Sequence, residues 1–101
     1  MTTLPIKTIP YDPAEDLVDE RDQVEILTEA FASGDQKFIA AALGAVARAR
    51  GMSSIAEKAG VTRPALYKAL SETGDPQLST LLGVVHALGL KLTIEPLANS
   101  V

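Results

Sequence analysis

The chain has 101 residues, a formal net charge of −4, no cysteine and one histidine. This length is typical of one domain, whose core needs no disulfides because folding removes roughly two thirds of the extended chain's surface from water. The missing cysteine excludes disulfides and thiolate metal sites, and the lone His86 cannot by itself form a metal cluster. We therefore expect no cofactor.

The apolar composition and the chain start bear on fold class and location. With two Phe, two Tyr and no Trp, the core must be built from Leu, Ile, Val and Ala, as is common in all-α helical bundles. No run approaches the roughly 20 apolar residues of a membrane span, and MTTLPIKTIPYD lacks the layout of a signal peptide. We expect a cytoplasmic protein with no membrane contact.

Charge divides the chain into two zones. Residues 1–35 carry two basic and nine acidic side chains, a net charge of −7, whereas residues 36–101 carry seven basic and four acidic ones, a net charge of +3. Such asymmetry predicts two binding surfaces, one suited to phosphate and one to a cationic protein. The alternative is that an acidic amphipathic helix only keeps the protein in solution.

The first third is predicted to hold an extended segment and two helices. Pro5 and Pro10 favour an extended conformation over residues 1–12. Asp12 and Pro13 can start a short helix through residue 17, and residues 19–32 form the next, ended by Ser33-Gly34. That second helix is amphipathic. Glu25 and Glu29 share one face, and the other face comprises Val24, Leu27, Thr28 and Phe31.

A central helix is predicted over residues 36–50. Asp35 can cap its start and Gly51 ends it. Four side chains recur along it at helical spacing, namely Ile39, Leu43, Val46 and Arg50.

Residues 52–71, MSSIAEKAGVTRPALYKALS, have the pattern of a helix-turn-helix. Ser54 and Glu57 form an S-x-x-E capping box for the first helix. The small Ala56 on this helix lets the second helix approach it closely. Gly60 can take the left-handed turn between the helices. Thr62 can cap the second helix, which begins near Arg63 because Pro64 suits a first turn.

The two sides of this motif differ in chemistry. Its inner side carries Ile55, Val61, Leu66 and Ala69, and its outer side carries Arg63, Tyr67, Lys68 and Ser71. The N-terminal residues of a recognition helix reach base edges, so we expect Arg63 and Pro64 to lie closest to the bases, with Arg63 reading a guanine. The alternative is an ordinary packed helical pair whose small residues serve close packing.

After the turn ETGDP, one more helix and a strand are predicted. The helix covers residues 77–88, with His86 partly exposed beside an apolar stripe that should complete the core, namely Leu78, Leu81, Leu82, Val85 and Leu88. The alternation of LKLTIEP predicts a short C-terminal β-strand. Its partner is either its own copy in a two-fold dimer, which would place two recognition helices roughly 34 Å apart, or residues 3–9.

The segments IAAALGAVARARGM, MSSIAEKAGVTRPALYKALS, LSETGDP and LSTLLGVVHALGLKL together make the chain resemble the addiction module antidote proteins. These are HigA-like antitoxins with a Cro/repressor-type helix-turn-helix, and the resemblance covers residues 9–95. It implies a compact all-α bundle that binds a small basic ribonuclease toxin of the RelE/HigB type and suppresses its RNA cleavage. It also implies repression of its own operon at a palindromic operator, which we expect the protein to bind as a homodimer.

The resemblance assigns residues to both zones. Residues 1–35 become an acidic, toxin-facing extension and helix, and residues 36–101 a DNA-binding domain with the C-terminal strand. The DNA contacts that the resemblance implies are Ser53, Thr62, Arg63, Tyr67 and Lys68, and we expect Ser54, Pro64 and Ser71 of the same motif to contact DNA as well. The expected toxin contacts are Tyr11, Asp16, Leu17, Glu20, Val24, Leu27 and Phe31. Related proteins often have Gln near Ser54, where the amide reaches a phosphate. Serine is shorter, so we expect this contact to be either lost or bridged by water.

Three functions follow as hypotheses. The first is an antitoxin that represses its operon and is not an enzyme, since no nucleophile, base or metal-ligand signature converges. The second is a stand-alone, phage-type repressor whose acidic third is packing or dimer surface. The third is an adaptor that binds protein only, which would leave Arg63 and Lys68 without a purpose.

Overall fold

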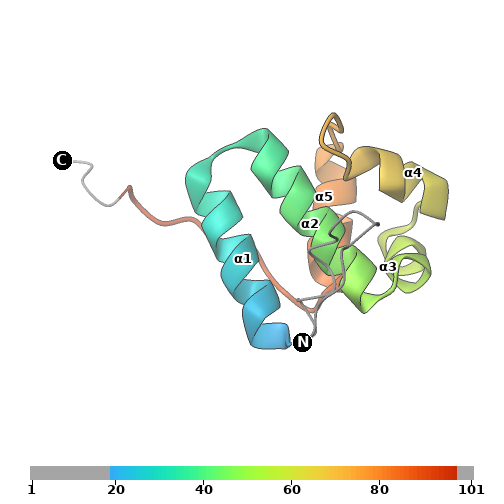
Figure 1. Cartoon of the computed structure of the whole chain (residues 1–101), viewed down its shortest axis with the longest axis horizontal. Coiled ribbons are helices and arrows are strands. Elements are labelled where there is room, and N and C mark those ends of the chain that lie inside the picture. Colours follow the sequence, from blue (N-terminus) through green and yellow to red (C-terminus); the bar gives the residue numbers. More distant parts are fainter. Residues whose placement is uncertain (1–18, 98–101) are drawn as a thin grey trace, which may run out of the picture.

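The computed structural model describes residues 19–97, which fold into a helical bundle (Figure 1). Its elements in chain order are α1 (Glu20–Ser33), α2 (Gln36–Arg50), α3 (Met52–Ala59), α4 (Arg63–Ala69) and α5 (Leu78–Ala87). The expected extended segment, the short helix after Asp12 and the residues Tyr11, Asp16 and Leu17 lie outside the described residues. The mostly helical fold expected from the composition is confirmed over residues 19–97.

The ends of α1 and α2 are set by side-chain caps and a glycine. Asp19 and Asp35 accept hydrogen bonds from the backbone N–H groups of Arg21 and Lys37, each at 3.0 Å. Gly34 has the left-handed φ of 69° that joins the two helices. Both predicted helices are thus confirmed.

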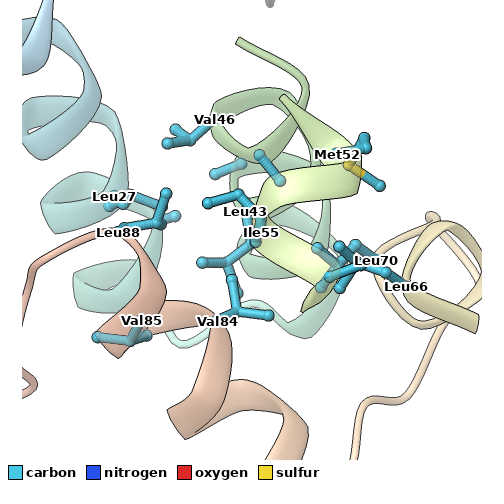
Figure 2. Packing of buried hydrophobic residues seen from close by; sticks show 14 residues of the cluster. Leu27, Leu43, Val46, Met52, Ile55, Leu66, Leu70, Val84, Val85 and Leu88 are labelled. Carbon is cyan, nitrogen blue, oxygen red and sulfur yellow. The ribbon is translucent and has the colours of Figure 1, made fainter. Parts of the chain in front are cut away.

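The core forms around α2, whose residues 42–47 are all buried. Leu43 and Val46 have no exposed surface, and Figure 2 shows Leu43 beside Ile55 at the centre of the cluster. Gly44 allows close packing because a Cβ there would lie 2.9 Å from the Leu70 carbonyl oxygen. The central helix therefore contacts both α1 and the helix-turn-helix segment.

The predicted capping box at Ser54 and Glu57 is wrong. The helix α3 begins at Met52, so Ser54 is its third residue, and Gly51 precedes it without a side-chain cap. Gly51 has φ 107° and donates its N–H to the Ala47 carbonyl at 2.8 Å, so it ends α2 and starts α3 at once. This direct junction leaves no loop residues to place Ser54 at a cap.

The apolar stripe expected on α5 is only partly buried. Val85 and Leu88 lie in the core, but Leu78 is 68% exposed and Leu82 is 37% exposed, so their placement in the core was wrong. A Cβ at Gly83 would lie 3.2–3.3 Å from Ala59, so α5 approaches α3 closely at this glycine. With α5 packed on α3 in this way, Val84 is buried in the core, although the predicted stripe omitted it.

The chain after α5 runs beside α1, as Figure 1 and the residues that line a groove between them both indicate. Leu90 donates its N–H to the Val85 carbonyl at 3.1 Å. Within residues 19–97 there is no β-strand, so the strand predicted for LKLTIEP is not formed inside the described chain. Its pairing with a second copy stays a prediction.

Across residues 19–97, no helix combines the length and the apolar character required to span a membrane.

Candidate nucleic-acid interface

The turn between α3 and α4 is built by backbone hydrogen bonds that close α3. Gly60, at φ 78°, donates to the Glu57 carbonyl at 3.2 Å, and Val61 donates to the Ala56 carbonyl at 3.0 Å. This pair of bonds is the Schellman arrangement, which needs a left-handed residue at the glycine position. The predicted role of Gly60 is confirmed.

The start of α4 also agrees with the sequence. The Thr62 hydroxyl accepts a hydrogen bond from the Ala65 N–H at 3.2 Å, and Pro64 lies in the first turn. A proline there gives up an amide with no intrahelical partner. The helix begins at Arg63, as predicted.

The inner side of the motif fixes which way α4 faces. Ile55 and Leu66 are buried with at most 2% of their surface exposed, and Val61 and Ala69 are half-buried. Ala56 is buried as well. Because these residues face the core, the opposite side of α4 must face solvent.

That outer side presents Arg63, Tyr67 and Lys68, all exposed. The Arg63 guanidinium donates to the Tyr67 hydroxyl at 3.5 Å, and its Cζ lies 5.6 Å from the centre of the Tyr67 ring. One helical turn separates the two residues, so the ring supports the guanidinium by a cation–π contact. A guanidinium held at a helix N-terminus can offer its paired N–H donors to a guanine edge or a phosphate.

The remaining expected DNA contacts differ in availability. Ser53, Ser54, Thr62 and Pro64 are exposed. Ser71 is half-buried, and its hydroxyl donates to the Lys68 carbonyl at 2.9 Å. The Thr62 hydroxyl serves as the helix cap. Arg63, Tyr67 and Lys68 are the exposed side chains of α4 that can donate hydrogen bonds to DNA, and we call them the accessible group. Ser53 and Ser54 are exposed on α3.

A second surface lies on α1. Glu20, Asp22, Glu25 and Glu29 are exposed and, with Asp19 and the basic Arg21, line a shallow hollow along the helix. Val24 is 40% exposed and Phe31 is half-buried, but Leu27 is 6% exposed and belongs to the core. Of the described residues expected to contact a toxin, Leu27 is therefore the least accessible. Figure 1 places α1 and α4 on opposite sides of the bundle.

Sequence reasoning missed a groove of about 750 Å³ between α1 and residues 90–97. Its walls include Val24 and Phe31 on one side and Leu92 and Ile94 on the other. The alternation of LKLTIEP indicated an unusual segment, but no local pattern could show that this segment lies along α1.

Comparison with known proteins gives two matches. The family model described as "Probable addiction module antidote protein" matches residues 7–96. An uncharacterized protein of Haemophilus influenzae is 42% identical over 85 residues, which cover 84% of this chain and 88% of that protein. No solved structure matches the chain significantly.

Proposed function

The chain belongs to the family of addiction module antidote proteins, and from this premise we propose that it is the antitoxin of a type II toxin-antitoxin module. It binds a RelE/HigB-like ribonuclease toxin directly and suppresses its RNA cleavage. It also represses its own operon by placing α4 of a homodimer in the major groove of a palindromic operator. It acts by binding and not by catalysis.

The observation that carries this proposal is the placement of two surfaces of opposite chemistry on one bundle. The accessible group Arg63, Tyr67 and Lys68 on α4 suits a polyanion, since cations that neutralise phosphates release condensed counterions. The acidic side of α1, with Glu25 and Glu29 one turn apart, suits a basic protein. Because α1 and α4 lie on opposite sides, both partners can bind together (Figure 1).

The toxin half of the proposal is tested by co-expression with the neighbouring reading frame, which we expect to encode a basic chain of about 100 residues, as the family resemblance implies. Expression of that neighbour alone should arrest growth, and co-expression should restore it. If the neighbour is absent and the protein captures no ribonuclease, the chain is a stand-alone repressor.

The DNA half is tested by operator affinity measured against salt concentration. Lys68→Ala should lower the slope of log affinity against log salt by about 1 for each subunit, or about 2 for the dimer, because one phosphate contact is lost in each half-site. Lys37→Ala, which removes an exposed lysine at the start of α2, is the matched control and should leave the slope unchanged. An unchanged slope in Lys68→Ala would contradict the proposed orientation of α4.

A further inference from the structure

The backbone of residues 91–96 is free to pair with another strand. The last backbone hydrogen bond before this segment joins the Leu90 N–H to the Val85 carbonyl. From Lys91 to Pro96, the described structure contains no hydrogen bond to another residue. A row of unpaired N–H and C=O groups along an extended segment is a template for an added strand.

The side chains of this segment are also unusually exposed for apolar residues. Ile94 is 98% exposed and Leu92 is 41% exposed, and both line the groove against α1. Val24, 40% exposed, faces the same groove from α1. Exposed apolar residues that form a contiguous surface indicate an interaction site, whereas single scattered ones do not.

The sequence of the segment is complementary to itself in one antiparallel register. If Thr93 lies opposite the same residue of a second copy, Lys91 lies opposite the partner's Glu95 and Leu92 opposite the partner's Ile94. Each pair occurs twice, so the register contains two opposite-charge pairs and two apolar pairs around a Thr–Thr pair. All three pair types stabilise antiparallel strands. Pro96, which has no N–H to donate, falls at the end of the ladder, where a proline is tolerated.

We propose that a second copy of this chain docks through this segment, with residues 91–95 of the two copies paired antiparallel about a two-fold axis at Thr93. The partner's strand lies in the groove and covers Val24 and Phe31 of α1. This inference deepens the homodimer part of the proposed function by naming its interface. It covers Val24 and Phe31, which the resemblance assigned to the toxin, and leaves the acidic side of α1, with Glu25 and Glu29, open to a toxin.

The test uses two full-length charge variants and their mixture, with dimer dissociation measured by sedimentation equilibrium. Lys91→Glu places two Glu–Glu pairs in its homodimer, and Glu95→Lys places two Lys–Lys pairs, so each variant alone should dimerise about ten-fold more weakly. In a mixture of the two variants, both cross-strand pairs of the heterodimer join a glutamate of one chain to a lysine of the other, so the heterodimer should form with nearly the affinity of the unmodified chain. The double variant Lys91→Glu/Glu95→Lys is a second rescue. Its homodimer again has two opposite-charge pairs and should dimerise with nearly the affinity of the unmodified chain.

The control is Lys37→Glu, which makes the same charge change on an exposed residue of α2 and should leave dimerisation unchanged. Circular dichroism of each variant shows whether the helices remain folded. The interface is contradicted if the unmodified chain is a monomer at about 100 μM, if the single variants dimerise normally, or if the double variant is as weak as either of them. Growth rescue by co-expression is scored separately, so failure of this interface is distinguishable from failure of the antitoxin proposal.

Discussion

The Arg50 side chain donates from Nε to the side-chain oxygen of Gln23 at 2.7 Å, which joins the end of α2 to the first turn of α1. The same guanidinium donates from Nη2 to the Leu88 carbonyl at 3.2 Å, where α5 ends. Gln23 is 3% exposed, the one polar residue in the buried part of the described chain. Arg50 thus connects three helices at the point where the chain enters the helix-turn-helix.

Loss of this connection should be costly. Arg50→Ala removes two hydrogen bonds made by a charged donor, and we expect it to lower the free energy of unfolding by about 2 kcal/mol. For a domain of this size, that is a decrease in melting temperature of about 10 °C. Arg21→Ala, which removes an exposed arginine on α1, is the matched control and should change stability by less than about 0.5 kcal/mol. Equal melting temperatures for the two variants would show that the connection adds nothing.

A second stability prediction concerns Gly44 in the middle of α2. Alanine is a better helix former by about 1 kcal/mol, so an isolated helix would gain from Gly44→Ala. In the folded chain the new methyl group would lie 2.9 Å from the Leu70 carbonyl, and we expect a net loss of about 1–3 kcal/mol. The looser contact at Gly83, 3.2 Å from Ala59, predicts a smaller loss for Gly83→Ala. Urea unfolding of both variants checks this order, and a stabilised Gly44→Ala would refute the close approach.

The sequence predicted those features that local chemistry decides. Asp35 and Thr62 cap helices as expected because the capping bond joins residues two or three positions apart. Gly34 and Gly60 end helices as expected because a left-handed φ favours glycine at any such turn. In each case the cause and the effect lie within a few residues of one another.

What the sequence could not supply depends on contacts between distant segments. Leu78 has the same helical spacing as Val85 in the predicted stripe, yet it is exposed because Gly83 sets how α5 meets α3. The hydrogen bond from Arg50 to Gln23 spans 27 positions, and Arg50 was expected only as part of a helical stripe. In the candidate interface, the exposure of Arg63 and Lys68 was foreseen, but the occupied hydroxyl of Ser71 was not.

Thr62 and Ser54 were both predicted to cap a helix, and only Thr62 does so. Thr62→Ala should lower the free energy of unfolding by about 1 kcal/mol because the Ala65 N–H loses its acceptor. Thr62→Ser keeps the hydroxyl and should retain most of that stability. Ser54→Ala should cost nothing, since Ser54 lies inside α3 and caps no group. Thermal unfolding distinguishes these outcomes, and a loss for Ser54→Ala as large as that for Thr62→Ala would restore the capping box.

The position of Arg63 predicts a separation of specificity from general affinity. Arg63→Lys keeps the positive charge but removes the paired N–H donors that read a guanine edge. We expect the free energy of operator binding to weaken by about 1–3 kcal/mol per half-site, with little change in binding to unrelated DNA or in the salt slope. Fluorescence anisotropy with operator and scrambled duplexes measures both quantities. Equal losses on the two duplexes would mean that Arg63 contacts the backbone and reads no base.

The acidic side of α1 predicts a variant that affects the toxin and spares the DNA. Reversing the two exposed charges in Glu25→Lys/Glu29→Lys should repel a basic partner and abolish growth rescue. Operator affinity should stay within about two-fold, because α1 and α4 lie on opposite sides of the bundle (Figure 1). Glu57→Lys/Glu72→Lys makes the same total charge change at exposed positions outside α1 and should still rescue growth. Because Glu25 and Glu29 lie away from the groove that holds Val24, the dimer should also persist in the first variant. Rescue that survives the α1 reversal would place the toxin on another surface of the antitoxin.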